Sequence, residues 1–150
     1  MDTLIKGADI VSMFCRININ TRNNLPIRSS EMGLLIFINQ SEEPPSSREA
    51  VEFFKVSKPM VAGMVRSLEK KDYLKRGDSP DTNRRFTLLL TDKGKKLVEE
   101  TTGEYLKSMA IMREGLGVED YDTLLTLLER ANTLMLEEDK NHLSRTTKNR

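Results

Sequence analysis

The chain has 150 residues, of which 24 are lysine or arginine and 23 are aspartate or glutamate, so its net charge at pH 7 is +1. This length favours a single domain over residues 1–150. No apolar run approaches the roughly 20 residues that cross a bilayer, the N-terminus lacks the order of a secretory signal, and one cysteine excludes a disulfide framework. We therefore expect a cytoplasmic protein that does not associate with membranes.

The first predicted helix covers residues 3–19, where apolar residues recur at three- and four-residue spacing. Cys15 falls on its apolar side. Arg16 is its neighbour in sequence but points elsewhere on a helix. A free cysteine usually packs as a small hydrophobe, and this is the role that we expect for Cys15.

Two short helices are predicted next. The first covers 31–40 and is expected to begin with Ser29 or Ser30 as its cap. The second covers 47–54, because Ser46 and Glu49 have the spacing of a capping box. Its expected buried residues are Ala50, Val51 and Phe54.

A fourth helix is predicted over 57–70, with Ser57 as its cap and Pro59 at a position where the missing N–H costs nothing. A three-residue turn joins it to the helix before it, which is the arrangement of a helix-turn-helix. Its apolar stripe is Val61, Met64, Val65 and Leu68. Its opposite face, expected to be exposed, carries Pro59, Ala62, Gly63, Arg66 and Ser67.

A basic hairpin is predicted after this helix. A turn-rich loop brings Arg84 and Arg85 beside its tip, and Phe86, Leu88 and Leu90 then alternate as in a half-buried strand. Residues 55–96 hold twelve lysines or arginines and five acids, a balance of +7, which leaves −6 for the rest of the chain. A basic segment in an otherwise acidic chain indicates a polyanion-binding face, although a solvated surface is the alternative.

The C-terminal third is predicted to be helical. Thr91 is expected to cap a helix over about 92–115, and a last helix over about 118–142 has nearly heptad spacing. The compact core is expected to span 27–97. The apolar stripes of residues 1–26 and 98–143 then need a surface to cover them. A second copy of the chain would do so, with internal core packing as the alternative, and 144–150 is expected to be a disordered tail.

Residues 27–97 resemble the MarR-type winged helix-turn-helix regulators of bacteria and archaea. The segments that carry the resemblance are Ser57–Lys58 with Val61 and Val65, Leu68–Lys71, Tyr73–Arg76, Pro80–Arg85 and Leu90–Gly94. Asp72 departs from the family, which usually has glycine there. The family's Asp-Arg-Arg wing motif fits with a one-residue ambiguity between Arg84 and Arg85. The resemblance implies a mainly α fold with a small β wing and with dimerisation helices at both ends.

A DNA interface follows from this arrangement. The leading end of helix 57–70 would enter the major groove, a helix N-terminus would bind backbone phosphate, and the wing would reach the minor groove. The residues predicted to contact DNA are Ser46, Ser47, Ser57, Lys58, Pro59, Arg66, and Arg84 or Arg85.

The predicted function is a homodimeric transcriptional regulator, a repressor that binds a pseudo-palindromic operator in double-stranded DNA. The resemblance also implies a small aromatic effector, for which Phe14, Phe37 and Met109 are candidate contacts, although plain core packing is the alternative for each. The resemblance also implies an alternative role for Cys15, as a sensor of oxidants. The rival class is a winged-helix dimer that acts as a protein-interaction module without sequence-specific DNA binding.

No enzyme, cofactor or metal site is predicted. His142 is the single histidine, and one histidine with one cysteine is too few for a typical zinc site. A Ser-His-acid triad would depend entirely on His142, and no serine is expected to have it as a base. The acidic run at 137–139 is most simply a helix surface.

Overall fold

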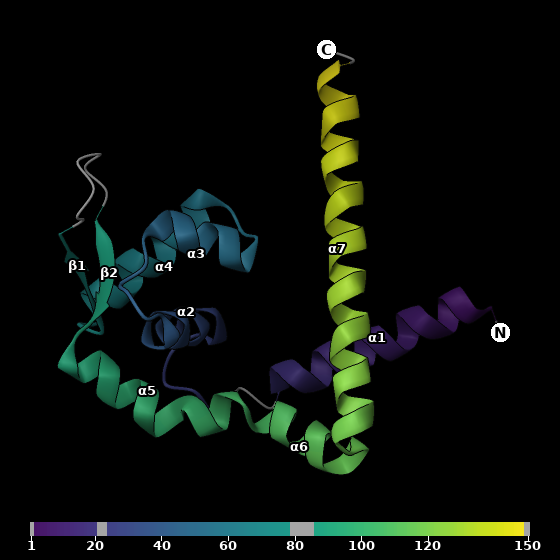
Figure 1. Cartoon of the computed structure of the whole chain (residues 1–150), viewed down its shortest axis with the longest axis horizontal. Helices are drawn as coiled ribbons and strands as arrows, with labels where there is room; N and C mark the ends of the chain where they lie inside the picture. The colour runs from purple at the N-terminus through teal and green to yellow at the C-terminus, as the bar shows by residue number, and fades with distance from the viewer. Residues whose placement is uncertain (1, 21–23, 79–85, 149–150) are drawn as a thin grey trace. The chain divides into compact units, whose positions relative to one another are not determined.

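The computed structural model describes residues 2–20, 24–78 and 86–148. Its elements are, in chain order, α1 (Thr3–Asn20), α2 (Ser29–Gln40), α3 (Ser47–Phe54), α4 (Lys58–Lys70), β1 (Leu74–Gly77), β2 (Thr87–Leu90), α5 (Asp92–Tyr105), α6 (Lys107–Leu116) and α7 (Val118–Lys148). The chain divides into two compact units, Met1–Lys107 and Ser108–Arg150 (Figure 1). The predicted fold class, mainly α with a small β wing, is confirmed. Across the described ranges, no helix combines the length and the apolar character needed to cross a membrane.

The core of the first unit lies among α2, α3, α4, the hairpin and α5, which together we call the winged lobe. Leu34 and Leu35 of α2, Leu68 of α4 and Leu88 of β2 are fully buried. The remaining buried apolar residues are Ile27, Met32, Ile38, Ala50, Val61, Val65, Leu74, Leu90, Leu97 and Val98. The predicted stripe of α4 is thus confirmed at Val61, Val65 and Leu68, with Met64 half-buried beside them.

Side-chain caps fix the residues at which the two helices of the helix-turn-helix begin. Ser46 caps α3 by accepting a hydrogen bond from the Glu49 amide at 3.2 Å, and Ser57 caps α4 in the same way through the Met60 amide at 3.2 Å. Lys55 ends α3 in the left-handed region, at φ 55°. This sharp turn aims α4 away from α3 within three residues, as the sequence predicts.

The hairpin is antiparallel, and Leu74 pairs with Leu90 at its base. β2 is also fixed along its other edge, because the Leu88 amide donates to the Pro45 carbonyl at 2.7 Å. Asp72, between α4 and β1, has φ 64°. That left-handed conformation explains why glycine is the usual residue at this place in the resembling family, and why aspartate, which tolerates it, can replace glycine.

Two predicted helix boundaries in the first unit are wrong. The expected serine caps of α2 lie inside the helix, because the Met32 amide bonds to the Arg28 carbonyl at 2.9 Å and so makes Arg28 the cap residue. The single helix expected over 92–115 is two helices that break at Leu106. The hydroxyls of Thr101 and Thr102 bond back to carbonyls four residues earlier, an interaction that bends helices.

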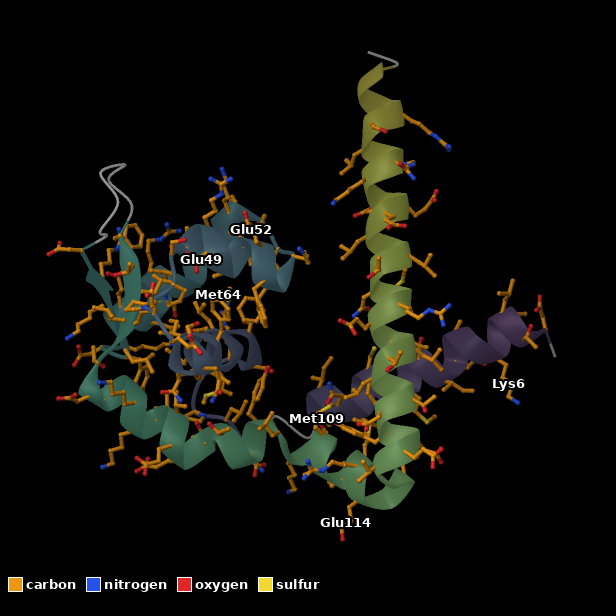
Figure 2. The ribbon with its side chains drawn as sticks, in the orientation of Figure 1. Lys6, Glu49, Glu52, Met64, Met109 and Glu114 are labelled. Atoms are coloured by element: carbon orange, nitrogen blue, oxygen red, sulfur yellow. The ribbon has the colours of Figure 1, made fainter. Side chains whose placement is uncertain are left out.

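The last helix continues beyond its predicted end. α7 runs to Lys148, so the segment 144–150, expected to be disordered, is helical as far as residue 148. No glycine or proline follows His142 to stop the helix. Figure 2 shows the side chains of α7 projecting on all sides of the helix.

The terminal helices carry apolar residues that their own chain leaves exposed. No residue of α1 is buried, and Leu4, Ile10 and Ile19 are all more than half exposed. Cys15 is a free, exposed thiol, so the expectation that it packs inside the chain is not met. The physical reason is that the stripe on which it lies packs against none of the described residues of the first unit's core.

Candidate nucleic-acid interface

The leading end of α4 presents a polar, solvent-facing turn. Ser57, Lys58 and Pro59 are all exposed, and the Ser57 hydroxyl is engaged in capping. Pro59 lies at the start of the helix, so it removes a donor that has no partner inside the helix. Arg66, two turns further along, is also exposed. These four predicted contacts therefore share the accessible side of one helix.

The N-terminus of α3 is the second predicted contact. Ser46 is half-buried, and its hydroxyl accepts from the Glu49 amide and lies 3.5 Å from the Glu49 carboxylate. One half of the predicted capping box, the bond from the Glu49 amide to the Ser46 hydroxyl, is thereby confirmed, and this hydroxyl is committed to the helix. An incoming phosphate would instead meet Ser47 and the remaining amides of the first turn, which have no partner within the helix itself.

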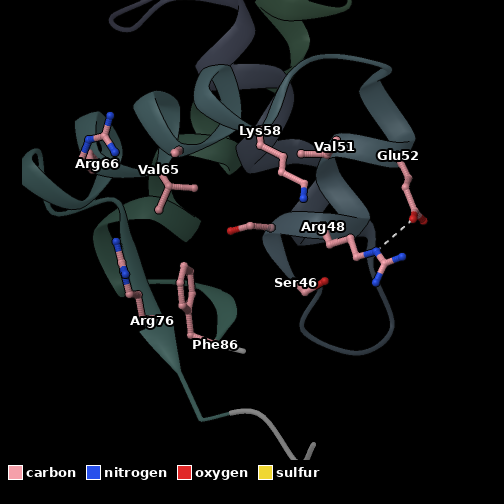
Figure 3. A pocket seen from close by; sticks show the side chains of 11 residues that line it. Ser46, Arg48, Val51, Glu52, Lys58, Val65, Arg66, Arg76 and Phe86 are labelled. Atoms are coloured by element: carbon pink, nitrogen blue, oxygen red, sulfur yellow. Dashed lines mark ion pairs between the residues drawn. The ribbon is translucent and has the colours of Figure 1, made fainter. Parts of the chain in front are cut away.

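One groove brings these elements together. It has a volume of about 670 Å³ and lies between α3, α4 and the side of the hairpin that carries Arg76 and Phe86. The predicted contacts Ser46, Ser47, Lys58 and Arg66 all line it. Figure 3 shows Arg66 and Arg76 on one side of the groove and Lys58 and Arg48 on the other. Its remaining lining residues are Val51, Glu52, Ala62, Val65 and Phe86.

Arg76 extends from β1 toward α4. Its guanidinium is bound to Glu69 of α4, with an Nη2–Oε1 distance of 3.0 Å. It also lies over the Phe86 ring, 4.2 Å from the ring centroid. Arg76 therefore ties the hairpin to α4 and forms part of the groove wall.

The groove lining is electropositive. It holds four cationic side chains, those of Arg48, Lys58, Arg66 and Arg76, against the single carboxylate of Glu52. Glu52 pairs with Arg48 at 3.4 Å, but both side chains are more than half exposed, so water screens this pair. Within the described residues, no hydrogen bond or ion pair joins Lys58 or Arg66 to another side chain. Both cations remain available to an anion.

Sequence reasoning missed Arg48 and Phe86 as parts of this site. Arg48 lies two residues after Ser46, the cap of α3, where a DNA phosphate was expected to bind. An arginine at that position in the sequence could have been predicted as a further phosphate contact. Phe86 was identified only as a strand residue. The predicted wing contacts Arg84 and Arg85 lie outside the described residues, so their register and their role stay predictions.

Of the expected effector contacts, Phe37 lies in a cluster of aromatic rings in the first unit. Phe37 packs against Phe53 and Phe54, with ring centroids 4.6 Å and 5.6 Å away. A separate hollow of about 300 Å³ lies near these rings. Its lining residues are Ser29, Ser30, Gly33, Phe54, Val56, Met60, Met64 and Tyr105. The roles predicted for Phe14 and Met109 as effector contacts stay predictions.

No family model matches the sequence, and no curated protein matches it either. Solved structures do match the fold. The S. aureus MepR–DNA complex is 19% identical with a TM-score of 0.73, over 90% of this chain and 99% of that chain. PcaV from Streptomyces coelicolor, solved with its natural ligand, is 18% identical with a TM-score of 0.70, over 83% and 88%.

A third similar structure is BpsR from Bordetella bronchiseptica, whose DNA binding is regulated by 6-hydroxynicotinic acid. It is 19% identical, with a TM-score of 0.71 over 84% of this chain and 91% of that chain. The chain thus has a winged helix-turn-helix fold. More particularly, its fold is that of MarR-type transcriptional regulators, as the sequence resemblance predicts.

Proposed function

We propose that the chain is a DNA-binding transcriptional regulator of the MarR type. The observation that carries the proposal is the groove beside α4, where Arg48, Lys58, Arg66 and Arg76 converge around a helix N-terminus. A helix of this kind fits the major groove, and the flanking cations suit the phosphates on either side. The fold shared with a DNA-bound regulator supports the same function.

The proposal includes a homodimer that acts as a repressor. A dimer reads two half-sites related by a two-fold axis, so its operator would be pseudo-palindromic. The exposed apolar residues of α1 and α7 supply surfaces for association. Occupying promoter DNA with such a dimer excludes other proteins from it, which is the simplest route to repression.

A small aromatic effector completes the proposal. The hollow lined by Met60, Met64 and Tyr105 has the volume of the smaller ligand pockets, which begin at about 300 Å³. Two of its residues belong to α4, so an occupant would contact the recognition helix itself. A ligand that prefers one arrangement of α4 would shift the population toward it. Ligand binding by structures of the same fold supports this part.

Duplex binding tests the DNA proposal. Random duplex DNA titrated against the protein at several salt concentrations should give a log affinity that falls linearly with log salt, by about 0.9 per phosphate contact. Selection from a random duplex library should then return a pseudo-palindromic site. The double variant Lys58→Ala, Arg66→Ala should bind the selected site more weakly than Lys6→Ala, Lys107→Ala, which removes the same charge elsewhere.

Salt-independent binding, or selection that enriches no sequence, would favour the protein-interaction module instead. The effector is tested separately with 6-hydroxynicotinic acid as the probe. It should release the selected duplex from the parent protein, and it should have less effect on Ser30→Trp, in which a large side chain fills the mouth of the hollow. Equal release from both proteins would remove the hollow from the proposal.

A further inference from the structure

The last turn of α4 is held by a buried carboxylate from another helix. Glu31, in the first turn of α2, is 3% exposed, and it is the one buried charged or polar residue recorded among the described residues. Its Oε2 accepts a hydrogen bond from the Ser67 hydroxyl at 2.9 Å and lies 3.4 Å from Lys71 Nζ. Its Oε1 lies 4.0 Å from Arg28 Nε.

This arrangement overturns one expectation for α4. Ser67 was predicted on the exposed face, but its hydroxyl is directed at α2. A buried carboxylate is costly unless it is paired and hydrogen-bonded, and an apolar pair of the same volume often stabilises a fold as well or better. Hydrophobic packing would therefore hold α2 against α4 without Glu31. What the carboxylate adds is one defined geometry between the two helices.

The same turn of α4 is fixed on its other sides. Glu69 holds Arg76 of β1, at Oε1–Nη2 3.0 Å. The Lys71 carbonyl accepts from Lys93 Nζ, at the start of α5, at 2.9 Å. The C-terminal end of α4 is thus joined by polar contacts to α2, to the hairpin and to α5.

Three of the residues expected to contact DNA, Ser57, Lys58 and Pro59, lie at the opposite end of α4. The helix has 13 residues and is therefore about 20 Å long. A tilt of about 10° at the fixed end would displace the leading end by about 3 Å, which is more than hydrogen bonds to base edges tolerate. Phosphate contacts are less demanding, because they act largely through charge.

We propose that Glu31 is a positioning residue for sequence-specific DNA binding, acting through Ser67 and Lys71 to set the angle at which α4 enters the major groove. This inference rests on the proposed function. It implies a separation of two affinities: loss of Glu31 lowers affinity for the specific site and leaves affinity for unrelated duplex unchanged. A residue with a merely structural role would lower both together.

The test uses the full-length protein, a duplex selected by the parent from a random library, and a scrambled duplex of the same composition. Glu31→Gln and Ser67→Ala should each lose about tenfold in affinity for the selected duplex, the scale of one good base contact. Both should stay within about twofold of the parent on the scrambled duplex, whose binding is set by phosphate contacts. The control Glu99→Gln, which removes an exposed carboxylate from α5, should match the parent on both.

The double variant Glu31→Gln, Ser67→Ala should lose less than the two single losses combined, because both changes break one contact. If Glu31→Gln does not fold, Ser67→Ala decides the question alone, since it removes a single oxygen. Equal losses on the two duplexes, or no loss on either, would overturn the positioning role. A parent that selects no sequence would overturn the proposed function and the positioning role together.

Discussion

The winged lobe and the terminal helices differ in how far their apolar side chains are buried. In the lobe, Leu34, Leu35, Leu68 and Leu88 are fully buried by other elements of the same chain. In α1 and α7, Ile10, Leu134 and Met135 are more than half exposed. The lobe is therefore complete as a folding unit, whereas the terminal helices have the composition of an interface without a partner. This difference is the structural basis for proposing a dimer.

A matched pair of substitutions should separate the two regions most clearly. Leu68→Ala removes a fully buried side chain of the lobe and should lower the free energy of unfolding by about 2–5 kcal/mol. Leu134→Ala removes a side chain that is 65% exposed. If a second copy covers it, the loss should be present where the parent is dimeric and should shrink as the protein is diluted, because a dissociated parent has no interface left to lose.

Urea denaturation at two protein concentrations measures both effects. The Leu68→Ala loss should be similar at the two concentrations. A Leu134→Ala variant that is indistinguishable from the parent at both would mean that α7 covers no interface at this position.

The wing should contribute the next largest effect, and it acts on DNA rather than on stability. Arg84→Ala or Arg85→Ala should weaken binding by about 1–3 kcal/mol, the scale of a good groove contact. The loss should be greater with A·T-rich flanks, whose narrow minor groove attracts guanidinium groups. Each change should reduce the slope of log affinity against log salt by no more than about one unit.

Both single variants and the double variant need measurement by fluorescence anisotropy, because the wing register leaves open which arginine enters the groove. Circular dichroism should confirm that each variant is folded. Unchanged affinity in all three would remove the wing from DNA binding and would favour the interaction module.

A smaller effect is expected at Asp72, in the turn between α4 and β1. Its φ of 64° suits glycine, so Asp72→Gly should raise the free energy of unfolding by at most about 1 kcal/mol. Asp72→Ala, the control, should lower it, since alanine lacks the polar side chain that helps aspartate adopt this conformation. Thermal unfolding distinguishes the two, and a destabilised glycine variant would contradict the role assigned to the backbone here.

The smallest effect is expected at Cys15. The thiol is exposed in the single chain, yet it lies on the stripe that a second copy would cover. If it is covered, the DNA affinity of the parent and of Cys15→Ser should be equally insensitive to peroxide. Binding that peroxide abolishes in the parent alone would establish the oxidant-sensing role.

What the sequence predicts well is local. The caps at Ser46, Ser57 and Thr91 involve groups only three residues apart, so their spacing is visible in the chain. The break at Leu106 was not predicted. The sequence does not show whether a threonine hydroxyl in a helix bonds to water or to a backbone carbonyl of the preceding turn.

The site was harder to predict because it depends on tertiary contacts. Ser46 and Phe86 line one groove although forty residues separate them, and Arg76 turns toward Glu69 because the hairpin folds back on α4. Glu31 gives no sequence signal of burial at all. Its partner Ser67 lies 36 positions away, and no helical periodicity connects the two.

Sedimentation equilibrium with a fluorescent duplex tests the central claim most directly, since that claim is a dimer of winged lobes on DNA. The duplex would carry one selected site, and the protein would be at micromolar concentration. The account predicts a free protein of twice 17.2 kDa and a complex with two chains per duplex. A stable monomer that binds one chain per duplex, or a dimer that forms no complex, would contradict it.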